Sequence, residues 1–289
     1  MKNDRPKIAL VIGAGGVKCA AALGVYQVLR QNKLAVNLLV GCSGGSIYAS
    51  FLALGLSAAE TEYVVSRLWT SEITRVKNKS GYLQALLPRN GRFKQTFALR
   101  DDRLILERLE EAFNTCRIEE TAIPLLINAT DFDSGESKIF REGSMVDAIR
   151  ASIAIPSIFQ PWSIDGTLYS DGILSNPLPI DVAAQEGADI IIAIGFSLPL
   201  PNRVNSTSRF NLYVNSIITN NLMDSKIALC ENAYGVNLLV INPAFKEKVG
   251  VFDTHKLPSI IAAGKRAMYQ QLDSLKVHLF QQMASRVEA

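Results

Sequence analysis

Short apolar runs that end in glycine-rich turns alternate with segments of helical spacing along the first part of this chain. Ile8 to Ile12 is such a run and is typical of a buried strand, and residues 20–30 after it have apolar positions at helical spacing. Leu38 to Val40 repeats the pattern, with a second glycine-rich turn and an apolar helix over 47–55. This repeat predicts the α/β class, with a mostly parallel sheet flanked by helices.

The rest of the chain continues the alternation of predicted strands and helices. Further helices are predicted over 57–69, 104–113, 145–151, 180–185, 210–233 and 258–280. Further strands are predicted over 124–129, 138–140, 189–196 and 237–241, with a hairpin around Asp165-Gly166. No internal repeat or linker interrupts the pattern, so we expect one domain over residues 1–289. Its expected parts are a core over 7–196, a cap-like basic segment over 70–103 and a C-terminal helical part over 210–289.

The basic segment differs in composition from its surroundings, because it is polar and rich in residues typical of loops. Between Arg67 and Arg103 the chain has nine Lys and Arg but three acidic residues. Two interpretations stay open, a solvated loop or a cap attracted to anionic lipid headgroups. The apolar contacts of such a cap would be Trp69, Tyr82, Leu86, Leu87 and Phe93.

Composition narrows the classes of partner and site. Hydrophobic residues make up 48% of the chain and charged residues 20%, which is typical of a globular protein with a sizeable core. A net charge of +3 is too small to indicate a nucleic-acid partner. The cysteines form no CxxC pair and no Cys/His cluster, so we expect neither a disulfide framework nor a metal site. Because no signal-peptide core and no membrane-spanning stretch is recognisable, we expect a cytoplasmic protein with at most peripheral membrane contact.

Gly41-Cys42-Ser43-Gly44-Gly45 matches G-x-S-x-G, between a predicted strand and a predicted helix. A serine on such a tight turn exposes its hydroxyl, and the flanking glycines remove Cβ atoms that would clash. The helix N-terminus behind it favours negative charge that develops nearby. The alternative is a structural turn with an unreactive serine. The context favours Ser43 as a nucleophile, with Gly41 and Gly45 supporting its turn.

A second glycine-rich loop, Gly13-Ala14-Gly15-Gly16-Val17-Lys18, follows the first predicted strand. A dinucleotide cradle would need G-x-G-x-x-G, but Lys18 occupies the last glycine position and no acidic residue ends the second strand. The loop suits an oxyanion hole better, with the N–H groups of Gly15, Gly16 and Val17 at a helix N-terminus. Lys18 would steady the loop or add positive potential. A purely structural turn and a nucleotide-binding loop stay open as alternatives.

A serine nucleophile requires a proton acceptor, and this chain has two histidines. We expect His278 on a solvated helix surface. We expect His255 at the entry to the last helix, because an α/β-hydrolase triad would need more strands before its nucleophile. Asp171, followed by Gly172, is the better candidate, since burial in a cleft would raise its pKa towards that of a base. The rival carboxylates, interpreted as loop residues at a strand end, are Asp131 and Asp133.

Four motifs therefore follow one another along the chain. They are Gly13 to Lys18, Gly41 to Gly45, Ala151-Ser152-Ile153-Ala154-Ile155-Pro156, and Asp171-Gly172-Ile173. In kind and order they resemble the oxyanion loop, G-x-S-x-G, A-S-x-x-x-P and D-G-[GA] motifs of the patatin-like phospholipases, particularly the bacterial branch. The resemblance spans residues 7–196 and is looser after them.

The resemblance implies a patatin-like three-layer fold and hydrolysis of phospholipid, lysophospholipid or other acyl-lipid esters. It also implies a Ser43–Asp171 dyad that works through an acyl-enzyme, with no metal or cofactor, and an oxyanion held by the loop from Gly13 to Lys18. Three residues depart from the family pattern, and they are Lys18 for Arg, Cys19 for Gly and Ile173 for a small residue. They motivate an alternative, a catalytically weak or inactive lipid-binding or regulatory protein that keeps the fold.

Overall fold

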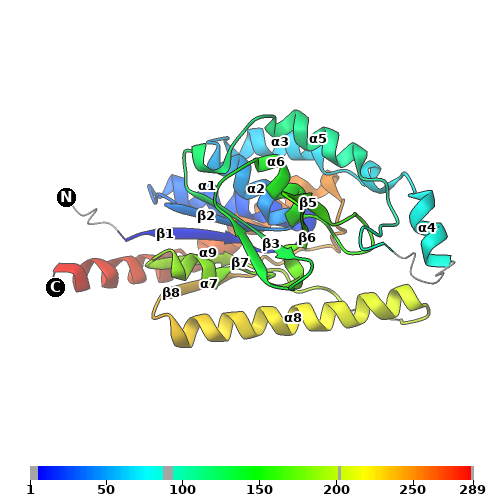
Figure 1. Cartoon of the computed structure of the whole chain (residues 1–289). Helices are drawn as coiled ribbons and strands as arrows, with labels where there is room; N and C mark the ends of the chain where they lie inside the picture. The colour runs from blue at the N-terminus through cyan, green and yellow to red at the C-terminus, as the bar shows by residue number, and fades with distance from the viewer. Residues whose placement is uncertain (1–5, 87–93, 201–202, 288–289) are drawn as a thin grey trace.

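A single mixed sheet runs through the middle of the molecule (Figure 1). In the computed structural model, which describes residues 6–86, 94–200 and 203–287, eight strands form it. Hydrogen-bonded neighbours follow the path β5-β6-β3-β2-β1-β7-β8, in which β6 and β2 pair with successive parts of one edge of β3, and β4 pairs with its other edge. The strands are β1 (Ile8–Ile12), β2 (Leu38–Cys42), β3 (Leu125–Asp131), β4 (Ser137–Phe140), β5 (Trp162–Ile164), β6 (Thr167–Asp171), β7 (Ile190–Ile194) and β8 (Asn237–Ile241). The pairs along β3-β2-β1-β7-β8 are parallel, whereas β4, β5 and β6 pair antiparallel. The predicted α/β class is confirmed.

Helices cover both faces of the sheet and complete a three-layer fold (Figure 1). The first face carries α1 (Ala21–Gln31), α2 (Gly44–Ala53), α3 (Ala58–Leu68), α5 (Arg103–Phe113), α6 (Met145–Ser152) and α9 (Leu257–Val287). The second face carries α7 (Ile180–Gln185) and α8 (Thr207–Ala233). The central strands β1, β2 and β7 are buried along their whole length, as parallel strands between two helix layers must be.

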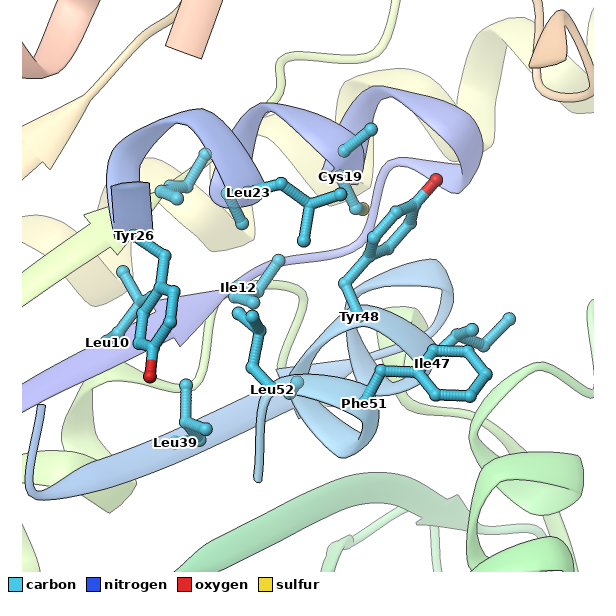
Figure 2. Close-up of a cluster of buried hydrophobic side chains, with 14 of the residues drawn as sticks. Leu10, Ile12, Cys19, Leu23, Tyr26, Leu39, Ile47, Tyr48, Phe51 and Leu52 are labelled. Carbon is cyan, nitrogen blue, oxygen red and sulfur yellow. The ribbon is translucent and has the colours of Figure 1, made fainter. Parts of the chain in front are cut away.

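Alternation along β1 divides the core into two clusters. Leu10 and Ile12 point to the first face, where α1 and α2 supply the opposing side chains. Figure 2 shows Ile12 between Leu23 of α1 and Leu52 of α2, and Leu10 beside Tyr26 of α1. Ala9 and Val11 point to the second face and pack with α7 and α8. The strand is therefore apolar throughout because each of its faces is covered.

The basic segment contains regular structure that its composition did not predict. After a 3-10 turn over Ser71–Thr74, the chain forms α4 (Lys79–Leu86) where a loop was expected. Trp69, an apolar contact under the lipid-cap interpretation, is 2% exposed, and its indole N–H donates to the Val251 carbonyl at 2.9 Å, so it does not offer that contact. Tyr82 is half-buried beneath the Lys77 ammonium. Leu87 and Phe93 lie outside the described residues, as does the side chain of Leu86.

The two histidines are far from Ser43 in the sequence, and each has a structural role of its own. His255 belongs to the 3-10 turn Thr254–Lys256 that enters α9, which confirms the expectation of a helix-entry residue. His278 was expected on a solvated surface, but its ring is half-buried, and Nδ1 lies 2.7 Å from the side-chain oxygen of Asn237 at the start of β8. The polar sequence around His278 gave no sign of this partner on another strand.

Candidate active site

Two strands end head to head on one edge of β3. Strand β2 pairs with β3 as far as Asn128, and β6 pairs with it from Ala129 onwards. Strand β4 pairs with Ile127 to Thr130, a stretch that overlaps the residues paired with β2 and those paired with β6. Because each edge of a strand pairs with one neighbour at a given residue, β4 must lie on the opposite edge. Strands β2 and β6 therefore share one edge of β3. Residue 43 follows the end of β2 and residue 171 ends β6. This arrangement brings the two predicted catalytic residues together.

Ser43 occupies a strained turn between β2 and α2. Its φ of 53° and ψ of −129° lie in a region that non-glycine residues rarely adopt. The Ser43 N–H donates to Ser152 Oγ at 2.8 Å, and Ser152 Oγ donates in turn to the Asn128 carbonyl at 2.7 Å. The Ser46 hydroxyl donates to the Ser43 carbonyl at 2.6 Å. These hydrogen bonds fix the backbone on both sides of the hydroxyl.

Asp171 faces this hydroxyl from a buried position. Ser43 Oγ donates to Asp171 Oδ2 at 2.7 Å, and the Ile173 N–H donates to Oδ1 at 2.9 Å. The Asp171 residue is 1% exposed, and this burial raises its pKa to about 7, against the opposing effect of the two hydrogen bonds. A carboxylate with this pKa can accept a proton from a serine hydroxyl near neutral pH.

The first glycine loop packs directly against the serine turn. A Cβ added to Gly44 would lie 2.8 Å from the Gly16 nitrogen, so the two backbones meet at van der Waals contact. Gly16 also has a φ of 56°, which favours glycine. Among the described residues, the N–H groups of Gly15 and Gly16 have no hydrogen-bond acceptor. They are therefore free to bind an oxyanion.

Val17, the third predicted donor, differs from these two glycines. Its N–H donates to the Val251 carbonyl at 3.1 Å, so it is already engaged in this conformation. The N–H of Gly44 is a donor that sequence reasoning missed. It opens α2, where the first N–H groups of a helix have no acceptor within it, and it lies against Gly16.

The three departures from the family pattern are accommodated in the site. The Cys19 thiol donates to the Gly13 carbonyl at 3.2 Å, which holds the start of the loop, and burial raises its pKa. Ile173 serves the site through its backbone N–H, which any residue except proline supplies. Lys18 is half-buried, and this desolvation lowers the pKa of its ammonium group.

The other carboxylates considered do not contact Ser43 or Asp171. Asp131 Oδ1 accepts hydrogen bonds from the N–H groups of Asp133 and Ser134 at 3.0 Å each, so it closes its own turn after β3.

Within the described part of the chain, no group of three His, Cys, Asp or Glu could hold a metal ion. Over the same residues, no helix combines the length and apolar character needed to span a membrane.

Asn128 and Ser152 are supporting residues that the reasoning from individual residues did not single out. Asn128 is fully buried, and its Nδ2 donates to the carbonyls of Gly172 and Asn176 at 3.1 and 2.9 Å. This buried amide therefore holds β3 against the turn that follows Asp171. The signal available in the sequence was a polar residue inside the apolar run over 124–129, and the serine of the A-S-x-x-x-P motif.

Comparison with known proteins places these features among described families. The family model described as patatin-like phospholipase matches residues 10–184. An uncharacterized NTE family protein of Mycobacterium tuberculosis is 31% identical over 195 residues, which are 68% of this chain and 50% of that protein. Patatin-like phospholipase domain-containing protein 6 of Homo sapiens is 29% identical over 189 residues, which are 65% of this chain and 13% of that protein. The chain thus spans about half the length of the mycobacterial relative. The crystal structure of VipD from Legionella pneumophila is similar with a TM-score of 0.48 and 14% identity, over 94% of this chain and 67% of that one.

Proposed function

This chain belongs to the patatin-like phospholipase family, and on that premise we propose that it hydrolyses acyl esters of lipids with Ser43 as nucleophile and Asp171 as base. The observation that carries the proposal is the hydrogen bond of 2.7 Å from Ser43 Oγ to a buried carboxylate whose pKa is about 7. The strained serine turn and the free N–H groups of Gly15, Gly16 and Gly44 support it.

In the proposed reaction, Ser43 Oγ attacks the ester carbonyl carbon while its proton passes to Asp171 Oδ2. The N–H groups of Gly15, Gly16 and Gly44 stabilise the negative charge that develops on the carbonyl oxygen. The alcohol then leaves with the proton from Asp171, and the acyl group stays bound to Ser43 Oγ as an acyl-enzyme. Water then gives its proton to Asp171 and attacks the acyl carbon, and the fatty acid leaves as Ser43 regains its proton. Phospholipids and lysophospholipids are the proposed substrates, and the chemistry requires no metal or cofactor.

Turnover of p-nitrophenyl esters and of phospholipids by four proteins tests the proposal. We expect Ser43→Ala and Asp171→Asn to leave near-background hydrolysis, because each removes one half of the dyad. His255→Ala should retain the wild-type rate, since His255 lies at the entry to α9. Reaction of the wild type with a fluorophosphonate probe, lost in Ser43→Ala, gives a second readout that needs no substrate.

Residual esterase activity in Ser43→Ala would contradict the assignment of the nucleophile. A wild type that neither hydrolyses esters nor reacts with the probe would instead support the non-catalytic alternative. In that case, replacing Lys18, Cys19 and Ile173 by the residues usual in the family would test whether these three departures cause the lack of activity.

A further inference from the structure

Helix α8 is longer than the strands it connects. It joins β7 to β8, which are parallel neighbours, so it must run back from the carboxyl edge of the sheet to the amino edge. Its 27 residues span about 40 Å, whereas a strand of five residues spans about 17 Å. The surplus length must therefore extend beyond the sheet, and Figure 1 shows α8 reaching past it.

The position of Asn220 shows which end of α8 extends. Its side chain accepts the Leu198 N–H at 2.8 Å and donates to the Leu198 carbonyl at 3.0 Å. Leu198 lies just beyond the end of β7, so Asn220 marks the level of the carboxyl edge. The first half of α8 consequently lies past this edge, which is the edge where Ser43 sits.

This half of α8, with the loop before it, exposes an apolar surface. Its members, which we call the α8 surface, are Leu200, Val204, Phe210, Ile217 and Ile218, between 36% and 58% exposed. Phe210, Ile217 and Ile218 share one helix face, because Ile217 and Ile218 follow Phe210 by seven and eight positions, about two helical turns. The buried stripe of α8 that packs on the molecule, Ser216, Met223 and Cys230, lies elsewhere on the helix. From Phe210 to Met223 the chain has no charged residue.

Unpaired cations lie on the same edge of the sheet. Lys77, Lys79 and Lys94 of the basic segment are exposed and form no ion pair among the described residues. The Gln95 amide donates to Asp133 at 3.4 Å, which places this segment beside the loop that follows β3. Val251 is 49% exposed and contacts Gly16 of the glycine loop, which packs against the serine turn. The α8 surface and the cations therefore both lie at the carboxyl edge of the sheet, the edge that carries Ser43.

We propose that the α8 surface and the cations of the basic segment dock this edge onto an anionic lipid bilayer, with the apolar side chains entering its interfacial layer. The lipid as occupant rests on the function proposed above. Exposed apolar side chains on an uncharged helix face suit the boundary between headgroups and acyl chains. Anionic headgroups would complement the unpaired lysines, which a second copy of this basic surface would not do.

Sedimentation with phosphatidylglycerol–phosphatidylcholine vesicles tests the docking surface without hydrolysis, if every protein also carries Ser43→Ala. The double variant Phe210→Asn/Ile218→Asn should bind the vesicles at least roughly tenfold more weakly, because it removes two apolar contacts. The matched control is Leu229→Asn, which replaces a leucine that is 49% exposed on the same helix but lies near its other end. It should bind like the parent, and thermal unfolding shows that each variant is folded.

Three outcomes separate docking from function. Equal vesicle binding by the double variant and Leu229→Asn overturns the docking proposal, even if the wild type hydrolyses esters. Weaker binding by the double variant alone supports docking, even if the wild type hydrolyses nothing and the proposed function fails. A double variant that changes from dimer to monomer in analytical ultracentrifugation, with vesicle binding unchanged, would assign the α8 surface to a second copy and overturn the proposal.

Discussion

Asp171 combines two properties that oppose each other. Burial penalises its charged form, while hydrogen bonds from Ser43 and Ile173 favour that form. The burial effect is larger, so the pKa lies at about 7 and not near the ordinary 3.8. A carboxylate in water would be too weak a base for a serine hydroxyl at neutral pH. In the proposed reaction, the burial of this one residue gives it the basicity that a histidine would otherwise supply.

The pH dependence of turnover follows from this pKa. Below pH 7 Asp171 becomes protonated and can no longer accept the Ser43 proton, so kcat/KM should fall about tenfold per pH unit. A pH–rate profile on a monomeric p-nitrophenyl ester measures this inflection. An inflection near pH 4 would contradict the burial of the base.

Unfolding provides an independent check on the same carboxyl group. Because its pKa is higher in the folded than in the unfolded chain, the folded state binds more protons between pH 4 and 7, and its stability falls as pH rises through this range. Asp171→Asn removes the buried charge, so it should be more stable than the wild type at pH 8, by up to about 4 kcal/mol, and nearly equal to it at pH 4. Chemical denaturation at the two pH values compares them.

Ser152 holds the backbone of Ser43, the proposed nucleophile, through a hydrogen bond. Ser152→Ala removes the acceptor of the Ser43 N–H and the donor to the Asn128 carbonyl, so two buried groups lose their partner. We expect a loss of about 1–3 kcal/mol in stability and slower fluorophosphonate labelling of Ser43. The control is Ser50→Ala, because the Ser50 hydroxyl on α2 is buried without a hydrogen-bond partner. If both variants label at the wild-type rate, Ser152 does not position the nucleophile.

At the scale of elements, α1 and α9 cross with their backbones in contact. A Cβ added to Gly24 would lie 2.1 Å from the Ile261 carbonyl oxygen, and one added to Gly264 would lie 2.0 Å from that of Ala21. Ala21 begins α1 directly after the 3-10 turn Gly16–Ala20, which carries the end of the glycine loop. The C-terminal helix therefore supports the proposed oxyanion hole from behind.

Gly264→Ala should separate these two helices. We expect a loss of about 1–3 kcal/mol from overpacking, and slower fluorophosphonate labelling because the glycine loop shifts with α1. Gly135→Ala is the control, since an added Cβ there meets no atom within 4 Å, although its positive φ carries a cost of its own. Loss of stability without any change in labelling would mean that the loop does not depend on the helix pair.

At the scale of the whole molecule, local patterns were enough to predict most elements. Apolar runs such as Ile8 to Ile12 predicted strands because both faces of the central sheet are covered. Helix α4 was missed, since it is short, contains a glycine and lacks a strong helical pattern. The engagement of the Val17 N–H and the partner of His278 were also missed, because the Val251 carbonyl and Asn237 are far away in sequence. The four ordered motifs indicated the candidate site, but no local pattern showed that β2 and β6 share one edge of β3.

This shared edge has a consequence for how quickly the site can form. Ser43 and Asp171 are separated by 128 positions, and the register between β1 and β7 joins segments even farther apart. Contacts of such long range require the closure of large loops, which slows folding of parallel sheets. During refolding, helical content should therefore return before Ser43 meets Asp171. No contiguous stretch of this chain shorter than the span between them can assemble the pair.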